Sequence, residues 1–197
     1  MATRLIEAPI GPIEIEAEDG ALVRLTMLPK ATKTEKAKGS RGGAKDEAVL
    51  DETVRQLGEY FAGKRRDFDL PLKPQGSAFR LKVWQALREI PYGEQRRYGD
   101  LAAKLKTAAR AIGGACGANP IGIIVPCHRV VGGQGWLGGF SGGDGSDTKR
   151  FLLGLESSGP LFANPQEATD RETSHARTHD HDRRRGRRQI PGLPRHA

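Results

Sequence analysis

The sequence has few of the features that mark secreted, membrane-spanning or metal-binding proteins. Only two of its 197 residues are cysteines, and no signal peptide is evident, so we expect a cytoplasmic protein in a reducing compartment. The longest uninterrupted apolar runs span only a few residues, which is far too short for a membrane helix. Residues 1–76 contain no cysteine or histidine, so no structural zinc site is expected there.

Hydrophobic residues are also scarce, at 37% of the chain, and the mean hydropathy is −0.55. These values are low for a fully folded chain of this length, which indicates that part of it does not fold. Residues 157–197 hold eight arginines, five acidic residues and four of the five histidines, and they are expected to form a disordered basic tail. Nonspecific contact with nucleic acid is a second interpretation of this tail. The remaining residues keep +5 of the net charge of +8, which favours a polyanionic partner for the folded part as well.

The region 1–76 predicts a small α/β domain. Residues 13–16 alternate apolar and charged side chains, Asp19-Gly20 is a hairpin signal, and residues 22–28 resume an apolar pattern, so two antiparallel strands are expected. Three further features are predicted downstream: a flexible loop over 29–45, a helix that carries Leu50, Val54, Leu57 and Phe61 and is closed by Gly63, and a short strand over 68–72.

A second region, 77–156, begins with three predicted helices. Ser77 is a plausible N-cap for a helix that buries Phe79, Val83, Leu87 and Ile90 and stops before Pro91. A second helix over 98–105 and a third over 108–118, with Thr107 as its N-cap, follow across a tight turn. Two short helices joined in this way match the outline of a helix-turn-helix, although many helical hairpins bind nothing.

The third helix has an unusually smooth surface. Gly113-Gly114 within a helix costs roughly 1 kcal/mol per residue relative to alanine, and a chain accepts this where another molecule must approach the backbone closely. Arg110 projects from this surface, which makes it a candidate wedge or phosphate contact. The alternative is an ordinary solvated arginine.

The apolar run 121–125 leads into the pentad Pro-Cys-His-Arg-Val at 126–130, and it predicts a strand that ends at a cysteine. A thiol becomes a strong nucleophile as its thiolate, which a neighbouring base or cation favours. His128 is the only histidine before residue 175. Adjacent strand residues point to opposite faces, so a contact between Cys127 and His128 requires a bend or a bridging water. The alternative is a small buried cysteine without chemistry.

Residues 132–145 contain eight glycines. Residues 133–138 match the dinucleotide-binding pattern G-x-G-x-x-G, but the glycines that follow cannot start the helix which that site requires. The segment is better suited to bringing backbone groups against a flat ligand. Ser146 or Asp147 is expected to cap a last helix, with Phe151, Leu152 and Leu155 facing inward and Glu156 near its end.

The helix pair, the segment from Arg110 through Asn119-Pro120, the pentad and the glycine-rich loop together resemble the O6-alkylguanine-DNA alkyltransferases. The resemblance is close over 77–156 and looser over 1–76. It implies an α+β fold, with a three-stranded ribonuclease H-like N-terminal domain (1–76), a winged-helix-like alkyl-transfer domain (77–156) and the basic tail. It also implies single-turnover, irreversible transfer of an alkyl group from O6-alkylguanine, and from O4-alkylthymine, in DNA to Cys127. The expected protein is a monomer that needs no cofactor or metal, enters the minor groove of double-stranded DNA and flips the damaged base out.

The resemblance also implies roles for individual residues. The catalytic residues would be Cys127 as acceptor, His128, Glu156, Tyr98, Lys149 and Asn119; the DNA contacts would be Arg110, Ala109, Ala111, Gly114, Thr107 and Arg129; and the substrate pocket would be formed by Val130, Phe140, Ser141, Gly142 and Trp136. Phe140 stands where the family often has tyrosine, and an extra residue lies between Gly143 and Lys149, so this segment departs from the family pattern at two points. Cys116 is expected to pack within the third helix.

Three other classes of protein are distinguishable from this one. An alkyltransferase-like protein that only recognises damage lacks the acceptor cysteine, which is present here. A helix-turn-helix transcription regulator leaves the paired Cys127 and His128 unexplained. A zinc nucleobase deaminase needs a second cysteine at position 130, which is valine, and an H-x-E segment, which is absent.

Overall fold

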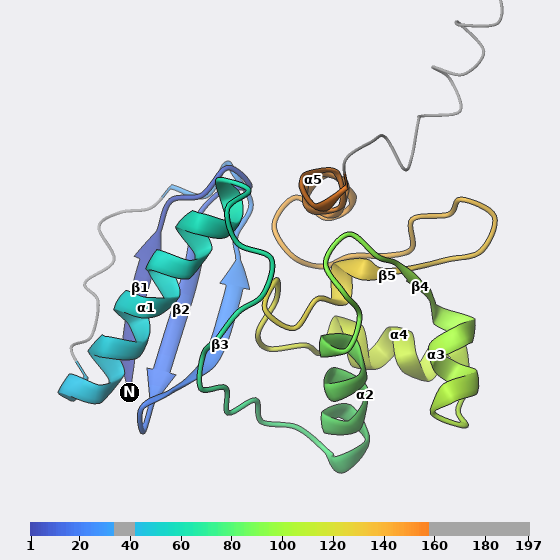
Figure 1. The fold of residues 1–197 in the computed structure, drawn as a ribbon, viewed down its shortest axis with the longest axis horizontal. Coiled ribbons are helices and arrows are strands. Elements are labelled where there is room, and N and C mark those ends of the chain that lie inside the picture. Colours follow the sequence, from blue (N-terminus) through green and yellow to red (C-terminus); the bar gives the residue numbers. More distant parts are fainter. Residues whose placement is uncertain (34–41, 158–197) are drawn as a thin grey trace, which may run out of the picture. The chain divides into compact units, whose positions relative to one another are not determined.

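The structure is a computed structural model that describes residues 1–33 and 42–157. The predicted tail from residue 158 onward, and the middle of the predicted loop 29–45, lie outside the described residues. The elements follow one another along the chain as shown in Figure 1: β1 (Ala2–Ile6), β2 (Ile13–Glu18), β3 (Ala21–Met27), α1 (Ala44–Phe61), α2 (Ala78–Arg88), β4 (Arg96–Arg97), α3 (Tyr98–Lys104), α4 (Ala109–Gly117), the 3-10 helix η1 (Cys127–Arg129), β5 (Val130–Val131) and α5 (Ser146–Glu156).

The N-terminal half is a three-stranded antiparallel sheet in the order β1-β2-β3, with α1 lying across one face (Figure 1). The predicted hairpin is confirmed, because Asp19 (φ 53°) and Gly20 (φ 75°) both occupy the left-handed region, as in the two-residue turns that suit twisted hairpins. The strand predicted over 68–72 is wrong. Leu72 makes a single parallel bridge to Leu22, and a ladder cannot extend through Pro71 because proline has no N–H to donate.

Helix α1 confirms the helix predicted from the spacing of its apolar residues. Leu50, Leu57 and Tyr60 are fully buried or nearly so, and Gly63 follows the helix with a φ of 70°, a conformation that glycine adopts without strain. The helix begins at Ala44, so the loop predicted over 29–45 ends two residues earlier than expected.

Helix α2 begins as predicted, with the hydroxyl of Ser77 accepting a hydrogen bond from the backbone N–H of Arg80 (3.4 Å). Val83, Trp84 and Leu87 are buried, but Phe79 is 38% exposed, so its prediction as a core residue is wrong. The indole of Trp84 contacts α4 instead, and its Nε1 donates a hydrogen bond to the carbonyl of Ala115 (2.9 Å). Phe79 lies in the first turn of the helix, outside this contact.

The two short helices predicted over 98–105 and 108–118 are present as α3 and α4, but Thr107 does not cap the second helix. The N-cap of α4 is Ala108, which makes no side-chain hydrogen bond there. The backbone N–H groups of Lys106 and Thr107 instead bond to the carbonyls of Ala103 (3.2 Å) and Ala102 (2.9 Å). This pattern is a Schellman closure of α3, with Lys106 in the left-handed region at a φ of 52°.

The strand predicted over 121–125 is also wrong. Ile121 makes one parallel bridge to Leu25, after which the chain turns, with Ile123 at a φ of 67° and the N–H of Val125 bonded to the carbonyl of Ile121 (2.9 Å). The run is apolar because this turn is buried in the core. Its four apolar side chains are at most 7% exposed, and Gly122 is buried as well. Cys127 therefore starts a 3-10 helix rather than ending a strand.

Helix α5 begins at Ser146 after the N-cap Gly145, so neither Ser146 nor Asp147 is the cap that was predicted. The buried positions on α5 follow helical spacing through Lys149, Leu152, Leu153 and Glu156. Phe151 is 40% exposed, so its prediction as an inward residue is wrong. The buried face of the helix is formed by the residues just named, and Phe151 lies outside it.

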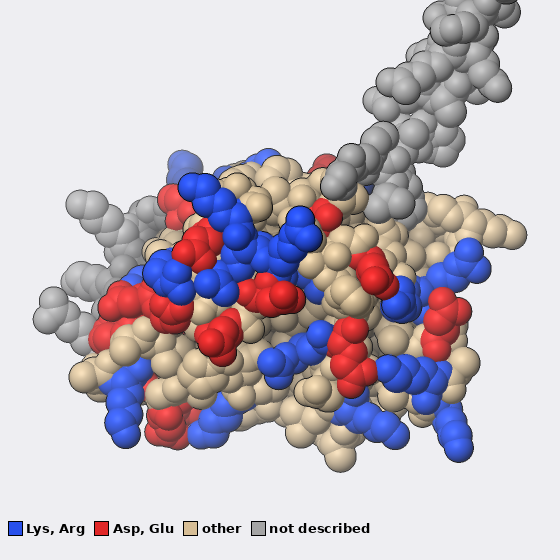
Figure 2. Space-filling model, in the orientation of Figure 1, with Lys and Arg blue, Asp and Glu red and all other residues tan. Residues whose placement is uncertain are grey.

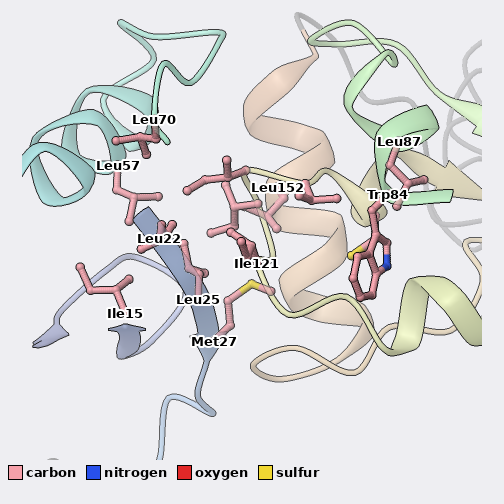
Figure 3. Close-up of a cluster of buried hydrophobic side chains, with 14 of the residues drawn as sticks. Ile15, Leu22, Leu25, Met27, Leu57, Leu70, Trp84, Leu87, Ile121 and Leu152 are labelled. Atoms are coloured by element: carbon pink, nitrogen blue, oxygen red, sulfur yellow. The ribbon is translucent and has the colours of Figure 1, made fainter. Parts of the chain in front are cut away.

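The two halves share one hydrophobic core, which Figure 3 shows between β3 and the segments that carry Ile121 and Leu152. Leu22, Leu25 and Met27 from β3 face Ile121 and Leu152 there. The backbone N–H of Leu25 donates to the carbonyl of Pro120 (2.8 Å), and that of Gly122 donates to the carbonyl of Leu25 (3.3 Å). The sheet thus positions the turn that leads to Cys127. In the described part of the chain, no helix is long and apolar enough to cross a membrane.

Candidate active site

A cavity of about 560 Å³ opens beside α4, with Cys127 in its wall. Its lining comes from α3, α4, η1 and the glycine-rich loop, so it joins segments that the sequence singled out separately. The lining residues are Tyr98, Ala109, Arg110, Gly113, Cys116, Gly117, Cys127, Trp136, Gly139, Phe140 and Ser141.

The turn before Cys127 is held by Asn119. Its side-chain Nδ2 donates to the carbonyl of Val125 (2.7 Å), and its Oδ1 accepts from the N–H of Ile121 (3.1 Å). The N–H of Cys127 in turn donates to the carbonyl of Val125 (2.8 Å). Asn119 therefore spans the buried turn and fixes where the cysteine emerges at the cavity.

Cys127 is only 8% exposed, and burial raises the pKa of its thiol. A hydrogen bond from Asn119 and the charge of Lys149 act in the opposite direction. Because burial dominates, the free protein holds a thiol at neutral pH, and a base is needed to generate the thiolate.

The imidazole of His128 is fully buried and has one partner. Its Nε2 lies 2.9 Å from Oε1 of Glu156, while Nδ1 is buried without a hydrogen-bond partner among the described residues. Burial lowers the pKa of His128, against the opposing effect of Glu156, so the ring is neutral at pH 7. Since Nε2–H donates to the carboxylate, the network assigns the lone pair to Nδ1, which makes Nδ1 the basic atom.

Glu156 is the centre of a buried polar cluster. It accepts hydrogen bonds from the hydroxyl of Tyr60 (2.7 Å), from Nε and Nη2 of Arg129 (2.8 and 2.9 Å) and from the N–H of Gly93 (3.4 Å), in addition to His128. Burial alone would raise the pKa of Glu156, but the hydrogen bonds from His128 and Arg129 outweigh it and lower the pKa to about 2. Glu156 is therefore a carboxylate that orients the imidazole.

The predicted DNA-binding role of Arg129 is wrong. Its side chain is 6% exposed and is paired with Glu156, and its Nη1 donates to the carbonyl of Ile90 (2.6 Å). A guanidinium in the core needs an anion and acceptors to offset its desolvation, and here they come from Glu156 and Ile90. The sequence analysis did not identify Tyr60 as a partner of Glu156. No local pattern links a residue of α1 to a carboxylate 96 positions later.

Tyr98 lines the cavity, and Lys149 lies behind it. Lys149 is fully buried, its Nζ donates to the carbonyl of Val130 (2.6 Å), and it lies 5.8 Å from the centre of the Tyr98 ring. Burial lowers the pKa of Lys149 to about 8 and raises the pKa of Tyr98 to about 12. Val130, whose backbone carbonyl was expected to contact the base, is itself fully buried and is not among the residues that line the cavity.

Three of the five predicted pocket residues line this cavity: Trp136, Phe140 and Ser141. Gly142 lines a neighbouring cavity. In the same loop, Gly138 has a φ of 79°, and a Cβ there would lie 2.9 Å from Cε2 of Tyr98. Glycine at this position lets the loop close over the tyrosine.

The outer surface of α4 beside the cavity is smooth. A Cβ added at Gly113, Gly114 or Gly117 would meet nothing within 4 Å, Ala109 and Arg110 are exposed, and Ala111 is half-buried. Arg110 has no ion-pair partner among the described residues. On the face drawn in Figure 2, by contrast, basic side chains are interspersed with acidic ones, whereas Arg110 lies beside the cavity on a helix that carries no acidic residue.

Comparison with known proteins gives a consistent result for both halves of the chain. Residues 78–158 match the family model for the DNA binding domain of 6-O-methylguanine DNA methyltransferase, and residues 1–74 match the model for its ribonuclease-like domain. A methylated-DNA–protein-cysteine methyltransferase of Methanosarcina acetivorans is 43% identical over 156 residues, which cover 78% of this chain and 97% of that protein. A constitutive one of Bacillus subtilis is 41% identical, over 76% of this chain and 92% of that protein.

Solved structures agree with the sequence comparison. The structure of Mycobacterium tuberculosis OGT in complex with DNA is 43% identical, covers 79% of this chain and 92% of that chain, and has a TM-score of 0.66. The O6-methylguanine methyltransferase of the same organism is 40% identical, covers 86% of this chain and all of that chain, and has a TM-score of 0.67. The predicted α+β fold and the resemblance drawn from the sequence are thereby confirmed. The chain belongs to the 6-O-methylguanine DNA methyltransferase family.

Proposed function

We propose that this protein repairs DNA by transferring the alkyl group of O6-alkylguanine, chiefly methyl, to the sulfur of its own Cys127. The observation that carries the proposal is the placement of Cys127 in the wall of the cavity beside α4, next to a histidine whose free nitrogen is basic. Relatives named methylated-DNA–protein-cysteine methyltransferases and a related structure in complex with DNA support it.

DNA binding begins with α4 against the minor groove. The smooth surface around Gly113 and Gly114 lets the sugar-phosphate edges approach the helix backbone, and Arg110 fills the space left in the duplex when the damaged base is flipped out. The base then occupies the cavity between Tyr98 and the glycine-rich loop. One molecule of the protein acts as a monomer on double-stranded DNA.

The chemical step replaces a carbon–oxygen bond with a carbon–sulfur bond. Nδ1 of His128 takes the thiol proton of Cys127 through a bridging water, and Glu156 stabilises the imidazolium that forms, as in other triads. The thiolate attacks the alkyl carbon in line with the bond to O6, whose electron pair stays on the guanine. Tyr98 donates a hydrogen bond to the base as this charge develops, and the charge of Lys149 behind Tyr98 favours the same transition state. The restored guanine then takes up a proton.

The product fixes the stoichiometry. A thioether is stable and the site offers no group to remove it, so each molecule reacts once, without a cofactor. O4-alkylthymine presents the same alkyl–oxygen bond and is a second substrate. The protein acts in the cytoplasm, where its thiols stay reduced.

Mass spectrometry tests the proposal directly. The purified protein is incubated with a duplex that contains O6-methylguanine, and we expect a gain of one methyl group per molecule that maps to the Cys127 peptide. Tight binding without a mass change would identify a damage-recognition protein instead. Preference for one undamaged sequence would identify a transcription regulator.

Arg110→Ala is expected to slow transfer from duplex DNA by about tenfold or more, a loss of about 1.4 kcal/mol of transition-state stabilisation, and to leave transfer from the free base O6-benzylguanine much less affected. The reason is that a free base needs no extrusion from a stack. Rates are measured by mass spectrometry over time. Arg55→Ala on α1, which removes the same charge from an exposed ion-paired site, is the control. Equal losses on both substrates would exclude a role for Arg110 in base extrusion.

Gly138→Ala is expected to lower the rate of transfer, because its Cβ would force Tyr98 to shift and because alanine is strained at a φ of 79°. Gly133→Ala is the matched control, since a Cβ there meets nothing within 4 Å and Gly133 does not line the cavity. The two rates are compared on free O6-benzylguanine, so that DNA binding does not enter. Equal rates for both variants would show that closure of the loop over Tyr98 is not needed.

A further inference from the structure

A second cavity, of about 400 Å³, also has Cys127 in its wall. It shares five lining residues with the first cavity: Cys116, Gly117, Cys127, Phe140 and Ser141. The acceptor cysteine therefore stands at the boundary between two spaces, of which the proposed reaction uses only the first for the base.

The second cavity is more polar than the first. Arg24 and Thr26 of β3, Gln75 of the segment before α2, and Asn119 supply hydrogen-bonding side chains to its wall. The guanidinium of Arg24 is 58% exposed and only loosely paired with Glu16, at 3.5 Å. A polar atom that enters this cavity can therefore find partners there, whereas most of the residues that line the first cavity are alanine, glycine, cysteine or aromatic.

The end of β3 forms the inner wall of the second cavity. Met27 lies in a notch made by two glycines, since its ε-methyl is 2.6 Å from where a Cβ at Gly122 would lie and 2.5 Å from where one at Gly142 would lie. Its carbonyl accepts a hydrogen bond from Gly143 (2.9 Å). Met27 has an unbranched side chain that adapts to its surroundings. It packs against both the turn that contains Gly122 and the loop that contains Gly142.

We propose that the second cavity receives alkyl groups longer than methyl that end in a polar atom, and that Met27 and Gln75 limit the length accepted. The inference rests on the proposed function, which places the base in the first cavity and the reacting carbon at Cys127. Atoms beyond that carbon extend past the boundary into the second cavity. A terminal hydroxyl there meets Thr26, Gln75 and Asn119, which avoids the cost of burying an unpaired polar group. The N-terminal sheet thus contributes to substrate selection.

The experiment compares three duplexes that carry O6-methylguanine, O6-butylguanine or the same butyl group with a terminal hydroxyl. For the unaltered protein, the hydroxylated group should be transferred faster than the plain butyl group. Gln75→Trp, at an exposed position on the cavity wall, should lower the rates with both long groups relative to methyl by about tenfold, the scale on which pockets reject excess volume. Gln85→Trp on α2, also exposed and outside both cavities, should leave these ratios unchanged.

Two further variants separate the contributions to the wall. Met27→Ala should raise the rates with the long groups relative to methyl, and Thr26→Val should reduce the advantage of the hydroxylated group over plain butyl. If Gln75→Trp changes all three rates by the same factor, or if the unaltered protein transfers the two butyl groups equally fast, the second cavity does not receive the substrate. Absence of methyl transfer by the unaltered protein would instead refute the proposed function itself.

Discussion

Cys127→Ala is expected to abolish alkyl transfer while the protein still binds alkylated duplex DNA. The substitution removes the sulfur that we propose as the alkyl acceptor and leaves α4 and Arg110 unchanged on the surface. The mass of the protein after incubation with an O6-methylguanine duplex should not increase, and its affinity in an electrophoretic mobility assay should remain close to that of the parent protein.

Cys116 provides the internal control, because it lines the same cavity and is the other cysteine of the chain. Burial raises the pKa of its thiol to about 12, and it has no histidine partner among the described residues. Cys116→Ala should therefore still gain one alkyl group per molecule. If the Cys127→Ala protein gained an alkyl group that mapped to Cys116, the assignment of the acceptor would be wrong.

Local patterns predicted the parts of the site that local chemistry determines. The pentad identified Cys127 and His128, the glycine-rich third helix singled out Arg110, and the structure brings Cys127 and Arg110 to one cavity. The helices were equally predictable, since apolar spacing and the Ser77 cap are properties of a few neighbouring residues. Such features depend little on the rest of the fold.

Errors arose where distant contacts decide the structure. Residues 121–125 have the composition of a buried strand, but β3 offers a partner only at Ile121, so the rest of the run turns within the core. Arg129 stands in a motif next to the acceptor and so was expected to contact DNA. Its actual partner, Glu156, lies 27 positions later on α5, and the cluster is completed by Tyr60 from the N-terminal half. Periodicity and spacing do not encode such pairs.

Glu156→Gln is expected to cause the largest loss of stability among single substitutions at this site. It removes the charge that compensates Arg129, which is 6% exposed, and disrupts the hydrogen bonds from His128 and Tyr60. Breaking a buried ion pair from one side costs about 3–5 kcal/mol, which is a large part of the 5–15 kcal/mol typical of a folded domain. The free energy of unfolding is measured in urea. Asp147→Asn, which breaks the exposed pair with Arg150 on the same helix, should change it little.

The double variant Arg129→Met with Glu156→Leu separates stability from chemistry. Apolar residues of similar volume can replace a buried ion pair with little loss, so this variant should recover much of the stability that Glu156→Gln loses, whereas alkyl transfer should stay slow because His128 has lost the carboxylate that orients it. Full recovery of transfer would show that Glu156 serves the fold alone.

Acid unfolding gives an independent measure of the same carboxylate. The pKa of Glu156 is about 2 in the folded protein, below its value of about 4.3 in an unfolded chain, so the unfolded state binds the proton first as pH falls. The stabilisation from Glu156 is therefore fully present above about pH 4.3 and is lost progressively as the pH falls towards 2. We expect the parent protein to lose stability over this interval more steeply than Glu156→Gln, which has no proton to take up at this position. Equal slopes for the two proteins would mean that the carboxylate is not held ionised by Arg129 and His128.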